Sequence, residues 1–173
     1  MSTLTADYYG FFGFPRKLSL DTAALQKRFY ELSRQYHPDR FAQKPAAERE
    51  RAEEATAILN DGYRTLKDPI ARAEYVLKQE GFDIGEQRSK DVPPELLEEV
   101  FEFNMALEDP DADLEEFHER FLKMRDEIDA SLEALFNKYD ASSDKSLLQQ
   151  IRNVLNRRRY IRNLINQAET RHV

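Results

Sequence analysis

A histidine and an aspartate are the residues of this chain whose types and spacing first suggest chemistry. They lie in the stretch QYHPDRF, where His37 and Asp39 flank Pro38. An imidazole oriented by a carboxylate can serve as a general base. However, the sequence has no glycine-rich phosphate loop, nucleophile elbow or HExxH pair, and no second histidine nearby. A metal-dependent hydrolase built on this pair is therefore a remote alternative. We expect no catalytic residue, no bound metal and no other cofactor.

The composition limits the kind of protein that carries this turn. The 173 residues are 40% hydrophobic and 34% charged, which is enough for one sizeable domain or two small ones. The chain has no cysteine, so disulfides, thiol catalysis and direct cysteine ligation of an iron–sulfur cluster are excluded. No apolar run approaches the ~20 residues of a membrane span, and the first residues lack the pattern of a secretory signal. We expect a cytoplasmic protein that makes no membrane contact.

The turn lies between two segments with the apolar spacing of helices. In residues 21–36 the apolar positions follow at steps of four, three and four, namely Leu25, Phe29, Leu32 and Tyr36. Asp21 stands at the N-cap position of this helix. Pro38 disfavours a helical conformation for His37, so the helix should end near Tyr36. Further helices are expected at about 46–66 and 70–79.

The second half of the chain predicts a separate helical domain. Periodicity is lost over residues 82–94, and we place a linker at 81–94 between domains at 1–80 and 95–173. Three helical patterns follow, with Arg158 as the one interruption in the last apolar face. Short polar connections between them favour antiparallel packing. The expected fold class is all-α, with an N-terminal helical hairpin linked to a C-terminal three-helix bundle.

The two parts of the chain differ in charge. Residues 1–80 hold 13 Lys and Arg against 12 Asp and Glu, net +1, and the remainder holds 13 against 21, net −8. Within the bundle, the first helix is acidic and the last is basic, which favours attraction between packed helices. A more specific alternative is that Arg157, Arg158 and Arg159 form a basic strip that binds nucleic acid. The acidic surroundings and the net charge of −7 argue against nucleic acid as a partner.

The context of the turn resembles a J-domain. The matching features are YYGFFGFP, the RQYHPDRF turn, Ile58-Leu59-Asn60, Tyr63, Leu66, Asp68-Pro69, Arg72 and Tyr75. The extension RAEYVLKQEGFDI, followed by an acidic helix and a bundle, resembles the HscB family of J-type co-chaperones for iron–sulfur cluster assembly. Eukaryotic relatives can carry an N-terminal cysteine-rich module, and the absence of cysteine here points to the bacterial form.

The resemblance implies contact with another protein rather than catalysis. In J-domain proteins the His-Pro-Asp turn and the basic helix before it dock on a DnaK-type ATPase chaperone and stimulate its ATP hydrolysis. A dedicated HscA-type chaperone is such a partner. Carried over to this chain, the binding residues are His37, Pro38, Asp39, Lys27, Arg28, Arg34 and Arg40. Arginine suits bidentate pairing with carboxylates of the partner.

The resemblance also implies a second contact, with an IscU-like iron–sulfur scaffold protein. The matching positions are Leu96, Leu97, Val100, Phe101, Asn104, Glu108 and Tyr160. Leu97 and Phe101 lie on a face beside the core stripe, where exposed apolar residues would suit a partner. For Leu96 and Val100 a wide buried face is an equal alternative. A general J-domain co-chaperone with another client is the alternative function.

Three residues depart from the family pattern. Phe101 and Asn104 stand where the family often has acidic residues, which leaves the identity of the scaffold open. Gly62 stands where the family favours alanine. A glycine there costs roughly 1 kcal/mol of helix stability but can permit close packing.

Overall fold

The computed structural model describes residues 7–82 and 92–171, which form two compact units, Met1–Gln79 and Glu80–Val173. Every regular element among these residues is a helix, so the expected all-α class is confirmed. None of the described helices combines the length and apolar character that a membrane span requires. Most of the expected linker, residues 83–91, lies outside the described residues.

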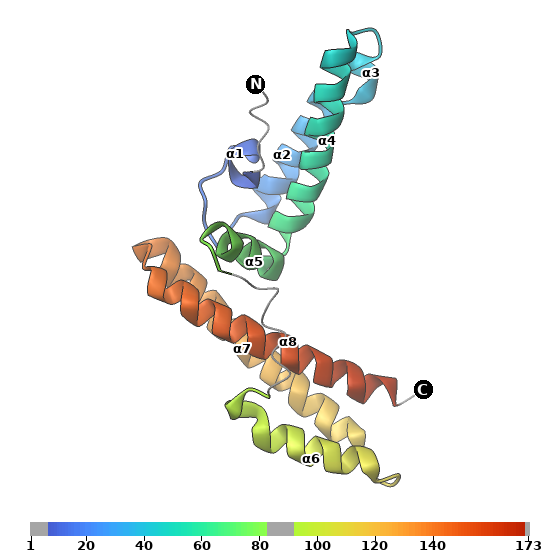
Figure 1. The fold of residues 1–173 in the computed structure, drawn as a ribbon, viewed down its shortest axis with the longest axis vertical. Helices are drawn as coiled ribbons and strands as arrows, with labels where there is room; N and C mark the ends of the chain where they lie inside the picture. Colours follow the sequence, from blue (N-terminus) through green and yellow to red (C-terminus); the bar gives the residue numbers. More distant parts are fainter. Residues whose placement is uncertain (1–6, 83–91, 172–173) are drawn as a thin grey trace. The chain divides into compact units, whose positions relative to one another are not determined.

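The first unit is a helical hairpin with three smaller helices (Figure 1). Its elements are α1 (Tyr8–Phe12), α2 (Thr22–Gln35), α3 (Pro38–Phe41), α4 (Ala46–Lys67) and α5 (Pro69–Gln79). Helices α2 and α4 pack against each other, and α1, α3 and α5 each pack on α4. The three helices expected in this region correspond to α2, α4 and α5. Helices α1 and α3 have no counterpart among the expected helices, because they are too short to show a helical period.

Local chemistry explains how the long helices begin and pack. The carboxylate of Asp21 accepts hydrogen bonds from the amides of Ala23 and Ala24, at 3.0 and 3.1 Å, so the expected N-cap is present. The Phe29 ring stacks on the Tyr63 ring of α4 with centroids 4.2 Å apart. The residues buried between these helices are Leu25, Leu32, Ala52, Ala55, Leu59 and Leu66. Together they hold the hairpin that carries the turn.

Helix α1 packs on α4 at Gly62. A Cβ atom at this glycine would lie 3.0 Å from Cε2 of Phe12 and 3.0 Å from Cδ1 of Tyr8. Tyr8 in turn stacks on Tyr75 of α5, and its backbone N–H donates to the Tyr75 hydroxyl at 3.0 Å. The missing side chain therefore makes room for two aromatic rings that join α1, α4 and α5.

The second unit is the expected three-helix bundle. A short 3₁₀ helix (Pro94–Leu96) leads into α6 (Leu97–Glu108), which is followed by α7 (Leu114–Ser142) and α8 (Lys145–Thr170). Helices α7 and α8 pack along much of their length as an antiparallel pair, and α6 packs on α7. Arg158, the interruption in the apolar face of α8, donates from Nε to Asp129 of α7 at 2.6 Å. An ion pair between the two long helices thus accounts for the interruption.

Candidate partner-binding surfaces

The His-Pro-Asp turn is a junction between two helices. Helix α2 ends at Gln35, and its C-cap residue Tyr36 donates from the backbone to Leu32. Pro38 is then the first residue of α3, and His37 is its N-cap. Proline suits this position because its fixed φ is helical and it has no N–H to leave unpaired. Pro38 indicated the end of α2 in the sequence, but the short helix that the same proline starts was not predicted.

The imidazole of His37 caps α3. Its Nδ1 atom accepts a hydrogen bond from the backbone N–H of Asp39 at 3.2 Å. In this geometry Nδ1 carries no proton, so the proton of the neutral ring is on Nε2. The nearest carboxylate oxygen of Asp39 is 3.6 Å from Nδ1, which is beyond hydrogen-bond distance. The pair is therefore not arranged as a carboxylate-oriented general base.

The same arrangement leaves the acidic group facing solvent. The side chain of Asp39 is 92% exposed, and that of His37 is 57% exposed. Within residues 7–82 and 92–171, no group of three or more histidine, aspartate or glutamate side chains could hold a metal ion. The turn presents a carboxylate on a backbone that the cap and the proline hold, and its exposed oxygens can reach another molecule.

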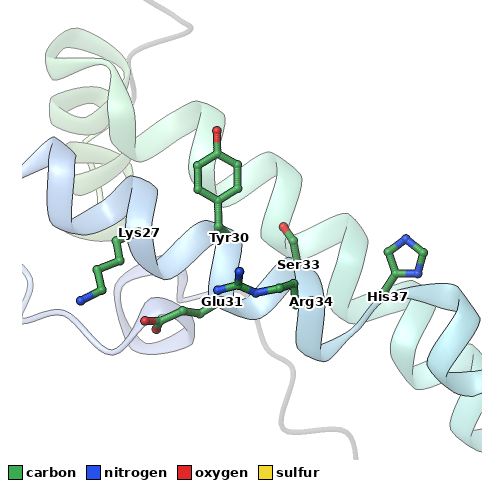
Figure 2. Close-up of a pocket in the computed structure, with 6 residues that line it drawn as sticks. All are labelled: Lys27, Tyr30, Glu31, Ser33, Arg34 and His37. Atoms are coloured by element: carbon green, nitrogen blue, oxygen red, sulfur yellow. The ribbon is translucent and has the colours of Figure 1, made fainter.

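A cationic stripe runs along α2 toward the turn. We define it as Lys27, Tyr30, Arg34 and His37, four exposed residues at steps of three, four and three. The first three lie on one face of α2, and His37 follows just beyond the end of the helix; Lys27 and Arg34 carry the charge. Together with Glu31 and Ser33 they line a shallow hollow of about 400 Å³ (Figure 2). The structure thus brings Lys27, Arg34 and His37 of the expected chaperone site together, and adds Tyr30. Arg40 is exposed on α3.

Arg28 has a different place. Its Nε donates to the backbone carbonyl of Phe12 at 3.3 Å, and another guanidinium nitrogen pairs with Glu31 at 3.2 Å. It does not line the hollow of the stripe. The guanidinium joins α2 to the end of α1 and neutralises Glu31, so its contribution to partner binding stays a prediction.

An exposed apolar row lies on α6. Leu97, Phe101 and Met105 are 56%, 68% and 58% exposed, and their spacing of four puts them on one side of the helix. Asn104 and Glu108 are also exposed and continue this side. Met105 was missed, although its position four residues beyond Phe101 was a signal that could have indicated it.

Two of the expected scaffold-binding residues lie in the core instead. Leu96, the N-cap of α6, is 1% exposed, and Val100 is 7% exposed on the face of α6 that also carries the fully buried Phe103. The ring of Phe103 meets Phe121 of α7 edge-on, with centroids 5.1 Å apart. Leu96 and Val100 can therefore serve a partner only by holding α6 in place. The sequence had left two alternatives for these residues, burial in a wide apolar face or contact with a partner, and the structure shows burial.

The remaining expected residue, Tyr160, lies on α8 and is partly exposed. The seven positions thus fall into three groups: four are exposed on α6, two are buried and one is on another helix. Acidic residues border the row on α6. One of them, Glu102, receives two hydrogen bonds from Arg120 of α7, at 3.1 and 3.2 Å, which fasten α6 to α7.

The hairpin and its capped turn define the class of the first unit. Residues 7–75 match the family model of the DnaJ domain, and residues 92–169 match that of the HSCB C-terminal oligomerisation domain. The protein is therefore a J-domain protein with an HscB-type helical domain. Together these two matches show that the chain belongs to the HscB family, J-domain co-chaperones of iron–sulfur cluster assembly.

Two solved structures agree with this assignment. Chaperone HscB from Vibrio cholerae is 29% identical, with a TM-score of 0.69, over 96% of this chain and 98% of that one. The human co-chaperone protein HscB is 24% identical, with a TM-score of 0.71, over 99% of this chain and 85% of that one. At that identity the human protein supports the fold alone.

Proposed function

We propose that the first unit docks on a DnaK/HscA-type chaperone and stimulates its ATP hydrolysis, while the bundle delivers an IscU-like scaffold protein. The observation that carries the proposal is the capped turn, which holds a 92% exposed Asp39 carboxylate at the end of a cationic stripe. Because the chain joins both contacts, binding the scaffold raises its local concentration at the chaperone.

In this proposal each residue of the turn has a physical role. Pro38 and the His37 cap fix the backbone, so little conformational entropy is lost when the turn is bound. Asp39 offers an ionised acceptor to a cation or hydrogen-bond donor of the chaperone. Lys27, Arg34 and Arg40 attract an acidic partner surface and raise the rate of encounter. The ATP chemistry belongs to the partner.

The proposed scaffold contact is the row on α6. Phe101 is 68% exposed, and burial of about 140 Å² of a ~200 Å² aromatic side chain is worth at most about 3.5 kcal/mol at ~25 cal/mol per Å². Part of this is lost to the cost of association. With Leu97 and Met105 beside it, Phe101 can serve as the central anchor. The acidic rim favours a partner surface that is apolar with basic edges.

The chaperone contact is tested by Asp39→Asn in the full chain. The substitution keeps the shape and the backbone donor to His37 but removes the charge, so we expect stimulation of the chaperone ATPase to be lost while the protein stays folded. Asp61→Asn, at an exposed carboxylate on α4, is the matched control and should stimulate normally. Full stimulation by a folded Asp39→Asn variant contradicts the proposal.

The scaffold contact is tested by replacing Leu97, Phe101 and Tyr160 with alanine together. We expect capture of the scaffold to be lost while stimulation of the chaperone alone is unchanged. Capture that survives all three substitutions contradicts the surface. If the wild-type protein stimulates the chaperone but does not bind the scaffold, the general co-chaperone with another client is the better description. The cytoplasmic location stays a prediction, which cell fractionation can check.

A further inference from the structure

Among the described residues of the first unit, Tyr30 is the one large apolar side chain that is exposed, with 54% of its surface accessible to solvent. Single exposed apolar residues are common on protein surfaces, so exposure alone carries no function. The position of this one is informative. Tyr30 lies three residues after Lys27, four before Arg34 and seven before His37, so it occupies the middle of the cationic stripe.

The ring projects from a rigid base. Tyr30 lies in the middle of α2, and its ring meets the Phe29 ring edge-on with centroids 5.7 Å apart. Phe29 is in turn stacked on Tyr63 of α4. Figure 2 shows the Tyr30 ring standing away from α2, while the Arg34 side chain runs back along the helix toward Glu31. An aromatic side chain with few rotatable bonds on such a base loses little entropy when it is bound.

The charges around the ring indicate the chemistry of its partner. Lys27 and Arg34 border the hollow, and the acidic residue that lines it, Glu31, is paired with Arg28 at 3.2 Å. Neutralising Glu31 leaves the hollow with a positive character. A surface that fits it has carboxylates at its edges and an apolar slot at its centre.

We propose that Tyr30 is the aromatic anchor of the chaperone contact, inserted into an apolar slot of the ATPase chaperone whose carboxylate edges pair with Lys27 and Arg34. This inference rests on the proposed chaperone contact and adds the residue that gives it an apolar component. Interactions between exposed charges weaken as salt screens them, whereas burial of an aromatic ring does not. Tyr30 therefore holds the complex, while Asp39 transmits the stimulation.

The test measures chaperone ATPase rate against concentration of the full-length protein, at low and at high salt. We expect Tyr30→Ala to raise the half-maximal concentration about tenfold or more at both salt concentrations, as for other aromatic anchors. The maximal rate at saturation should be unchanged, because Asp39 is intact. Tyr30→Phe should retain the wild-type half-maximal concentration within about twofold, since the ring supplies the contact.

Two controls make the outcomes distinguishable. Gln35→Ala changes an exposed residue of α2 on the side away from the stripe and should have no effect. Lys27→Ala should weaken binding mainly at low salt.

If Tyr30→Ala leaves the half-maximal concentration unchanged while Asp39→Asn abolishes stimulation, the anchor is overturned and the chaperone contact stands. A Tyr30→Phe variant as weak as Tyr30→Ala also overturns the aromatic anchor. If Asp39→Asn stimulates normally, the underlying proposed function fails.

Discussion

Replacing Gly62 with alanine sets two measurable effects against each other. Alanine is the better helix former, and the change should stabilise an exposed helix position by about 1 kcal/mol. At Gly62 the new Cβ would lie 3.0 Å from Phe12 and 3.0 Å from Tyr8, closer than carbon atoms pack without strain. Both neighbours are ring atoms, which cannot move aside as a flexible side-chain end can.

The second effect should be the larger. Overpacking of a core by one methyl group costs about 1–3 kcal/mol. Phe12 is 1% exposed, and Tyr8 is held by its stack on Tyr75, so neither ring has free space to enter. Subtracting the gain in helix propensity, we expect Gly62→Ala to lower the stability of the first unit by about 0–2 kcal/mol.

Native-state hydrogen exchange of the α4 amides in the full chain measures this change locally. Asn60→Ala is the control, because it raises helix propensity at an exposed position of the same helix without a new core contact. In a Tyr8→Ala background the cost of Gly62→Ala should shrink, because two of the three closest contacts of the new Cβ are to Tyr8. An increase in stability of about 1 kcal/mol on Gly62→Ala alone would refute the packing argument.

Two further predictions concern the contacts between helices. Arg158→Ala should destabilise the bundle by about 1 kcal/mol, because it removes a partly exposed ion pair with Asp129 while leaving that carboxylate able to reach water; urea unfolding measures the loss. Tyr75→Phe should cost a similar amount, because the hydroxyl accepts from the Tyr8 amide and from Gln79. Burial raises the pKa of the Tyr75 hydroxyl, so the folded state holds this proton more tightly than the unfolded state. Stability should therefore fall as the pH rises through the alkaline range, and Tyr75→Phe should flatten this part of the stability–pH curve.

The long helices could be predicted from the sequence because their apolar residues repeat at steps of three and four over many turns. Helices α1 and α3 could not, since five and four residues are too few to show a period. The packing role of Gly62 also required the structure. A glycine in a helix signals either a weak point or a close contact, and only the positions of the Phe12 and Tyr8 rings decide between these.

The candidate surfaces were predictable to different degrees. The turn was identified from its residue types, but the cap that His37 makes depends on the geometry of α3. At the start of the bundle the spacing placed Leu97 and Phe101 beside the core stripe, but apolar residues occupy almost every side of α6, so the sequence left open whether Leu96 and Val100 are buried or face a partner. The exposure of Tyr30 was not predicted for a similar reason: it stands next to Phe29, which belongs to the core stripe of the same helix.

The most direct test of the central claim is the ATPase rate of a DnaK/HscA-type chaperone, measured with this protein, with an IscU-like scaffold, and with both. If one chain recruits the scaffold and activates the chaperone, the rate with both should exceed the product of the two separate stimulations. Asp39→Asn and the triple alanine variant on the scaffold surface should each remove this synergy, for different reasons. A rate with both that equals the rate with this protein alone would contradict delivery of the scaffold, and no stimulation at all would contradict the chaperone contact itself.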